Sequence, residues 1–298
     1  MNKINYYHSL IFFNSCILLS AFEFLRDNSL LILSLFLILS LGISHGALDH
    51  IKGKKLLKLL NYKSISAFYI LYIVVGLSVI LLWLLFSKIL LLIFLIVASY
   101  HFGKEDSEFI SSKSNLELVY FFKGSLVITA PLLFHKTETL NIFNNLNFNI
   151  SQSLFISNEF LYLLIAISLF ANIIISFNKQ IDIKSLLLMD FISILLLNYF
   201  LNPILAFTIY FCFLHSIRHS FKLSNELNKK NFFKGFKEFL IKAMPLTILT
   251  AILFLISLFF LNTYYFLDNA ISKVIFIGLA SLTFPHILLE YLLEKNEK

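Results

Sequence analysis

Histidines gather where the apolar stretches of this chain end. Six of its eight histidines lie in four short segments, GISHGALDH, SYHFGKED, FLHSIRH and FPHILLE. These six are His45, His50, His101, His215, His219 and His286. A polar side chain at the edge of a hydrocarbon layer is costly and usually marks a functional position. Because imidazole is also a common ligand of transition metals, the pattern predicts a metal site in a membrane protein.

The spacing within these segments predicts which side chains share a helix face. His215 and His219 are four residues apart, so both rings can bind one ion from one helix. A carboxylate stands four residues after three other histidines, where it could accept the second imidazole N–H. These pairs are His45 with Asp49, His101 with Glu105, and His286 with Glu290. A regular helix places His45 and His50 about 140° apart, so we expect only one of these two to reach the ion.

Composition indicates that lipid surrounds most of the chain. Hydrophobic residues make up 59% of the 298 residues and charged residues only 14%, against about 45–50% and about 25% in soluble domains. The few glycines and prolines and the lack of alternating strand patterns argue against a β-barrel. We therefore expect an all-α, polytopic bundle of about eight to ten transmembrane helices, with residues 1–298 forming a single domain.

Hydropathy suggests ten spans, because a helix needs about 20 residues to cross a bilayer. They lie near residues 8–24, 29–49, 65–87, 88–104, 116–134, 158–177, 185–201, 203–221, 243–262 and 271–293. The polar gap at 135–158 is expected to be an external loop. The basic, phenylalanine-rich segment 222–242 is expected to lie along the membrane surface as an interfacial helix.

The basic residues indicate the orientation of the chain. Most lysines and arginines lie before the first span or in the segments that follow even-numbered spans, which is typical of the cytoplasmic side. The histidine segments end the second, fourth, eighth and tenth spans, so all four reach that same side. We expect a multi-pass protein of the cell inner membrane with both termini and the metal site toward the cytoplasm. This topology accounts for the net charge of +7, and no nucleic-acid partner is expected.

The four histidine segments resemble the signature segments of the Brp/Blh family, which are bacterial and archaeal membrane enzymes that cleave β-carotene to retinal. The matching residues are 42–49, 101–106, 210–219 and 282–286, and they occur in order over nearly the whole chain. The resemblance implies an Fe(II) dioxygenase that opens the central 15,15' double bond of β-carotene with O2 and gives two all-trans retinals. A retinal-binding rhodopsin is then the expected user of the product.

The same resemblance implies roles for individual residues. The iron ligands, and hence the catalytic residues, would be His45, His101, His215 and His219. Residues assigned to support of these ligands or to substrate positioning are Asp49, His50, Glu105, His286 and Glu290.

Two other classes of function remain as alternatives. A membrane di-iron hydroxylase or desaturase also uses histidines at cytosolic helix ends, but it needs about eight of them with HxxHH boxes, and this chain has no HxxHH. A transporter with a histidine relay would carry polar residues to the middle of its spans. Here the spans are mostly apolar until they reach their cytoplasmic ends, which favours the dioxygenase.

Overall fold

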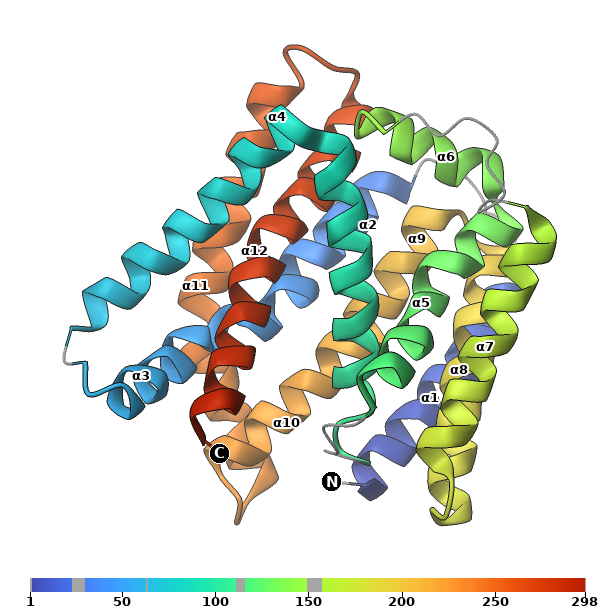
Figure 1. The fold of residues 1–298 in the computed structure, drawn as a ribbon, viewed down its shortest axis with the longest axis horizontal. Coiled ribbons are helices and arrows are strands. Elements are labelled where there is room, and N and C mark those ends of the chain that lie inside the picture. Colours follow the sequence, from blue (N-terminus) through green and yellow to red (C-terminus); the bar gives the residue numbers. More distant parts are fainter. Residues whose placement is uncertain (1, 23–29, 63, 111–115, 149–156, 298) are drawn as a thin grey trace.

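The chain folds as a bundle of helices, and every regular element among the described residues is helical (Figure 1). The computed structural model describes residues 2–22, 30–62, 64–110, 116–148 and 157–297, with the backbone alone at residues 2, 45 and 297. In chain order the elements are α1 (Asn2–Ser20), α2 (Leu31–Leu37), η3 (Ile38–Gly42), η4 (Ile43–Leu48), α3 (Asp49–Leu59), α4 (Ile65–Glu105), α5 (Glu117–Phe134), α6 (Lys136–Asn145), α7 (Asn158–Ser176), α8 (Ile181–Phe200), α9 (Pro203–Ile209), η7 (Tyr210–Ser216), α10 (Ile217–Leu227), α11 (Phe232–Leu261) and α12 (Leu267–Glu297).

The predicted all-α, polytopic membrane class is confirmed. Within the described residues, eight continuous helical runs are long and apolar enough to cross a membrane. The run Leu31–Leu59 joins α2 through α3, and Pro203–Leu227 joins α9 through α10. The first expected span, 8–24, falls mainly in α1, which packs along α8 and is not one of the eight.

The longest helix, α4, consists of two arms joined at a bend. Phe86 lies at the bend with φ −135° and ψ 46°, which are not helical values. In Figure 1 the first arm rises to the top of the bundle and the second descends from it, and α4 packs against α5 and α12. The spans expected at 65–87 and 88–104 correspond to these two arms. The descent returns the end of α4, with His101 and Glu105, to the level at which α4 began.

The structure corrects two sequence predictions about loops and surface helices. The segment 222–242 does not form a separate interfacial helix, because its first part ends α10 and Phe232 begins α11, which continues to Leu261. The Asn231 side chain caps that start by accepting a hydrogen bond from Lys234 N at 3.0 Å. The gap expected as a loop at 135–158 contains α6, which packs against α5 and α12; residues 149–156 lie outside the described residues.

Two glycines let α4 and α5 touch backbone to backbone at the histidine-bearing end of α4, where Gly103 lies between His101 and Glu105. A Cβ atom on Gly103 would lie 1.8 Å from the Tyr120 carbonyl oxygen, and one on Gly124 would lie 1.9 Å from the Ser99 carbonyl oxygen. Helices in membranes use small residues in this way to approach closely. The crossing therefore fixes the position of His101 and Glu105 relative to α5.

The helices that carry the GISHGALDH and FLHSIRH segments are irregular where they meet. The π-helical η3 leads into the 3₁₀ segment η4, and the π-helical η7 contains His215. The Ser216 hydroxyl donates to the Gly42 carbonyl oxygen at 3.2 Å, and a Cβ on Gly42 would lie 2.7 Å from the Phe211 ring. Since π-helical turns are frequent at functional sites, these two segments point to the place where chemistry occurs.

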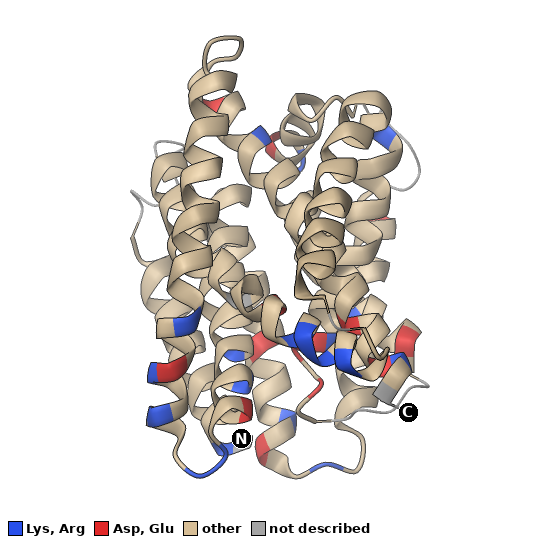
Figure 2. Ribbon diagram, turned by 90° about the vertical axis from the view of Figure 1, so that its left-hand side faces the viewer, with Lys and Arg blue, Asp and Glu red and all other residues tan. Residues whose placement is uncertain are grey.

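Charged residues are concentrated at one end of the bundle. Figure 2 shows most lysine, arginine, aspartate and glutamate positions in the half that also carries both termini. Elsewhere the outward surface is apolar: large side chains of the first arm of α4 and of α11 are exposed, among them Ile70, Leu77, Leu84, Ile248 and Leu255. Exposed apolar surface on this scale is suited to contact with lipid.

Candidate metal centre

Four histidines and one glutamate from distant parts of the chain meet inside the bundle. His101 and Glu105 come from the last turns of α4, His215 from η7, His219 from α10 and His286 from α12. None of these five side chains is more than 9% exposed. This group is called the histidine cluster below.

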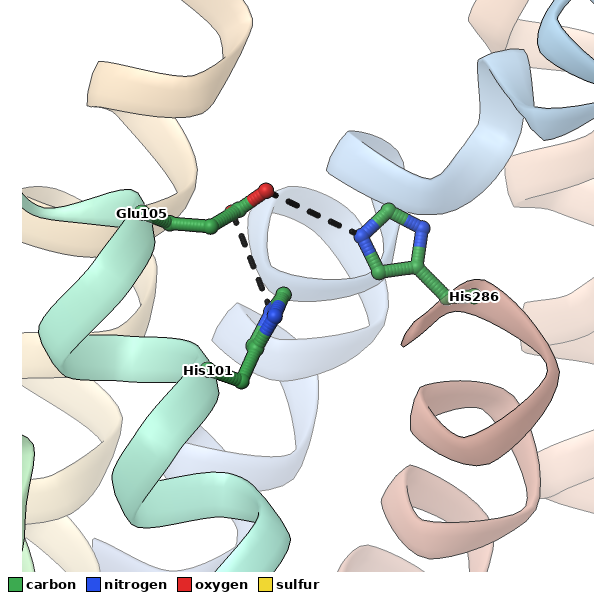
Figure 3. Close-up of side chains that lie close together, drawn as sticks. All are labelled: His101, Glu105 and His286. Atoms are coloured by element: carbon green, nitrogen blue, oxygen red, sulfur yellow. Dashed lines mark ion pairs between the residues drawn. The ribbon is translucent and has the colours of Figure 1, made fainter. Parts of the chain in front are cut away.

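Glu105 lies at the middle of the histidine cluster. Its Oε2 atom is 2.9 Å from His219 Nδ1, 3.7 Å from His101 Nε2 and 3.7 Å from His215 Nε2. Its Oε1 atom is 4.0 Å from His286 Nε2. Figure 3 shows the carboxylate reaching between His101 and His286, which extend toward it from opposite helices. Ring nitrogens of all four histidines therefore face one small volume.

A second carboxylate orients the His215 ring from its outer side. His215 Nδ1 lies 3.0 Å from Asp106 Oδ1, and the Tyr210 hydroxyl donates to Asp106 Oδ2 at 2.7 Å. The carboxylate can only accept, so Nδ1 carries the proton of a neutral His215. A lone pair then remains on Nε2, which faces Glu105. Outer carboxylates that fix a tautomer in this way are typical of metal-ligating histidines.

Asp106 also belongs to a buried ionic network behind the cluster. Arg218 donates from Nη1 to Asp190 Oδ2 at 2.8 Å and from Nη2 to the Ser9 hydroxyl at 2.8 Å. Burial alone would raise the pKa of Asp106, but the nearby His215, Lys123 and Arg218 outweigh it and hold that pKa well below its usual range. Asp106 is therefore an anion beside His215.

Sequence reasoning missed several of these residues although the histidine segments contained them. Asp106 follows Glu105 directly, and Arg218 stands between His215 and His219. Both were visible as charges within apolar surroundings, which is a signal of a functional or paired group. Tyr210, and Tyr72, whose hydroxyl donates to Asp49 Oδ2 at 2.8 Å, carried no comparable signal, since tyrosines are frequent in this chain.

The other predicted site residues have different surroundings. The His45 side chain lies outside the described part of the structure. His50 Nδ1 bonds the Ala47 carbonyl oxygen at 3.0 Å, and among the described residues no hydrogen bond or ion pair joins His50 to the cluster. Glu290 pairs with Lys52 instead of bonding His286. Asp49 bonds His286, which comes from a different helix.

A polar cavity of about 290 Å³ opens onto one side of the cluster. Its inner wall includes Glu105, His215 and His219, and its outer part includes Glu108, Lys222, Asn225 and Glu226. Charged and polar side chains of this kind suit water and ions.

Aromatic rings also pack against the cluster, around His215. The Phe102 ring centroid is 4.9 Å from that of His215, and Phe211 stacks on His215 at 5.8 Å. Phe207 in turn stacks on Phe211 at 5.5 Å. Phe207 and Phe211 precede His215 along a helix that runs toward the charged end, so this aromatic wall lies on the hydrocarbon side of the cluster.

The donor set of the cluster fits a transition metal. Ligand atoms of His101, Glu105 and His286 all lie within 4.8 Å of one another. Neutral imidazoles with a carboxylate suit Fe(II), and zinc and copper also accept imidazole. The donors alone are therefore suitable for a metal ion without selecting which metal.

Comparisons with known proteins show to which family the chain belongs. A sequence model of the family described as beta-carotene 15,15'-dioxygenase matches residues 36–294, which include all four histidine segments. The chain is also 27% identical over 264 residues to a protein of an uncultured marine bacterium, 66A03, named beta-carotene 15,15'-dioxygenase; the match covers 86% of this chain and 91% of that protein. No solved structure matches the chain. The extent of the family match shows that this chain belongs to the β-carotene 15,15'-dioxygenase family, a family of oxidoreductases.

Proposed function

We propose that this protein cleaves β-carotene at its central 15,15' double bond with O2 and releases two molecules of all-trans retinal. The observation that carries the proposal is the buried histidine cluster, placed between a polar cavity and an aromatic wall in a chain of this family. A buried donor set with a cavity on one side and packed aromatic rings beside it suits a reaction between a dissolved gas and a polyene.

The proposed cofactor is Fe(II), held by His45, His101, His215 and His219. Two of these residues, His101 and His215, present Nε2 at the same distance of 3.7 Å from Glu105 Oε2, so their donors converge. His45 is included among the proposed ligands because of its sequence motif. Its backbone lies in η4, which contacts η7. When bound, iron supplies the activation of O2.

The surrounding carboxylates hold the proposed ligands in one protonation state and one orientation. Asp106 accepts from Nδ1 of His215, and Glu105 stands 2.9 Å from Nδ1 of His219. Fixing both rings reduces the reorganisation needed when the metal binds. Two buried anions also offset the positive charge of a divalent ion.

The aromatic wall is proposed to hold the polyene and to determine which double bond meets the metal. Phe102, Phe207 and Phe211 form a continuous surface of rings that ends at His215. Positioning of this kind is a major contribution to rate when both reactants are otherwise free. β-Carotene is dissolved in the bilayer, so we propose that it reaches this wall from the membrane. The charged cavity on the other side would serve water and metal ions.

We also propose that the charged end of the bundle faces the cytoplasm, with both termini and the metal centre. The gathering of basic residues at that end supports this orientation. The product is apolar and stays in the membrane, where a retinal-binding rhodopsin is the proposed recipient.

Expression in a β-carotene-producing bacterium tests this function. We expect the orange colour to fade while retinal accumulates, two molecules for each β-carotene consumed. The variant His215→Ala should leave the colour intact, because it removes a proposed ligand. Intact carotene with the unmodified protein would overturn the proposal, and hydroxylated carotene would favour a di-iron hydroxylase instead.

A further inference from the structure

His286 on α12 has partners of the same residue types as His215, an aspartate and a tyrosine. His286 Nδ1 lies 2.8 Å from Asp49 Oδ2 and 2.9 Å from Asp49 Oδ1. The Tyr72 hydroxyl donates to Asp49 Oδ2 at 2.8 Å. The side chains of His286 and Asp49 are only 3% and 6% exposed, so this chain of contacts is buried.

The hydrogen-bonded series at His215 has the same order of groups, histidine, aspartate and tyrosine, and nearly the same distances. There Nδ1 meets an aspartate at 3.0 Å, and a tyrosine hydroxyl donates to that aspartate at 2.7 Å. In both series the Nε2 atom faces Glu105, at 3.7 Å for His215 and 4.0 Å for His286. The two series of side chains come from different parts of the sequence. One contains Asp106 and Tyr210, and the other contains Asp49 and Tyr72.

We propose that His286 is a further ligand of the metal, donating through Nε2, with Asp49 and Tyr72 as its positioning residues. This inference rests on the proposed function, because it assumes that the cluster binds iron. It goes beyond the four histidines implied by sequence motifs, in which His286 only supports the site.

The partners of His286 favour a role as metal ligand over a role in packing beside the site. A histidine that only packed would not need a buried aspartate on Nδ1, since burying a carboxylate costs several kcal/mol unless its charge is used. The aspartate leaves the lone pair of a neutral His286 on Nε2, which is the atom nearest the cluster. His101 lies close by, with 5.3 Å between the two ring centroids. The ligand atoms of His101, Glu105 and His286 are within 4.8 Å of one another.

A metal ligand on α12 would link this helix to the other helices that contribute to the cluster. α12 packs against α3 and α4, and it carries His286 opposite His101 (Figure 3). Metal binding would therefore join α4, η7, α10 and α12 across the core.

The first test removes only the hydroxyl that holds Asp49. We expect Tyr72→Phe to weaken Fe(II) affinity of the purified full-length protein by about 10-fold, measured by competition with a chelator, as outer-shell changes generally do. Tyr210→Phe should act similarly through Asp106, which contacts the proposed ligand His215. Tyr69→Phe is the matched control, because Tyr69 lies one turn earlier on α4 and is 38% exposed. Equal affinity of Tyr72→Phe and Tyr69→Phe would overturn the inference.

The second test asks whether the ring itself touches the metal. In His286→Gly, reconstituted with iron and ¹⁵N-labelled imidazole, we expect imidazole to restore iron affinity. Pulsed electron paramagnetic resonance of the nitric oxide adduct should then show coupling to ¹⁵N. Restored affinity without ¹⁵N coupling would show that His286 only supports the site, and unchanged affinity in His286→Gly without imidazole would also overturn the inference. If the unmodified protein binds no iron, the proposed iron function itself fails, which is a different result.

Discussion

At the scale of single residues, Glu105 decides how the centre is organised. It is four residues after His101, as the sequence spacing predicts, and His101 Nε2 lies 3.7 Å from it. It also contacts three histidines from other elements, which no local spacing could show. A buried carboxylate is unfavourable unless a cation offsets its charge, and a metal ion held by these rings would do so.

The variant Glu105→Gln keeps the shape of this side chain and removes its charge. We expect Fe(II) affinity to fall by about 10- to 100-fold, because His219 loses its anionic partner. Titration of iron into the purified protein measures the change. Glu294→Gln serves as control, since Glu294 pairs with Lys104 near the surface. If both variants bind iron as tightly as the unmodified protein, Glu105 has no role at the metal.

Replacement of Asp190 is expected to lower the stability of the protein. Its carboxylate pairs with the buried Arg218, so Asp190→Asn leaves a buried guanidinium without its counter-charge. We expect the free energy of unfolding to fall by about 3 kcal/mol. Unfolding in detergent followed by circular dichroism measures it. Asp182→Asn changes an exposed aspartate of the same helix and should have little effect; a similar loss in both variants would contradict the ion-pair explanation.

At the scale of elements, close crossings and irregular turns position the centre. α4 meets α5 at Gly103 and Gly124, and η3 meets η7 at Gly42. The π-helical turn of η7 sets the direction of His215 within an otherwise regular helical run. Hydropathy located these helices but could not show the bends, because each bend depends on contacts with another helix.

Gly103→Ala tests the crossing of α4 and α5. Its new Cβ would lie 1.8 Å from a carbonyl oxygen of α5, so the helices must separate and carry His101 and Glu105 with them. We expect a loss of about 3 kcal/mol of stability, together with a lower iron content per chain. Gly46→Ala is the control, since its Cβ would meet no atom closer than 4.0 Å. Wild-type stability and iron content in Gly103→Ala would show that the crossing is not required.

Particular residues show how far sequence reasoning reaches. The order of spans correctly placed His101, His215, His219 and His286 at one level of the bundle, because membrane thickness ties position along the chain to depth. The i, i+4 spacing of His286 and Glu290 did not predict a contact, because Lys52 on α3 takes Glu290 and Asp49 takes His286. Tertiary partners of this kind cannot be read from the spacing within one helix.

At the scale of the whole molecule, charge and apolar surface divide the bundle. The charged end carries both termini, and the remaining outer surface displays large apolar side chains. In the proposed function, the membrane-dissolved substrate and water-soluble groups reach the histidine cluster from different sides. The positive-inside rule then predicts the cytoplasmic orientation.

The orientation is tested with fusions to the C-terminus. A fluorescent protein that matures only in the cytoplasm should be bright there, and alkaline phosphatase, which is active only after export, should be inactive. The same two reporters placed after residue 146, at the end of α6, should give the reverse result. Active phosphatase at the C-terminus would contradict the proposed topology.

The most direct measurement is the product and metal balance of the purified enzyme. Iron is removed with a chelator and restored, and β-carotene and retinal are counted in each state. We expect one iron per chain, two retinals for each β-carotene consumed, no retinal after iron removal, and no retinal with His101→Ala. Undiminished retinal formation by the iron-free protein, or consumption of β-carotene without retinal, would contradict the proposed iron-dependent cleavage.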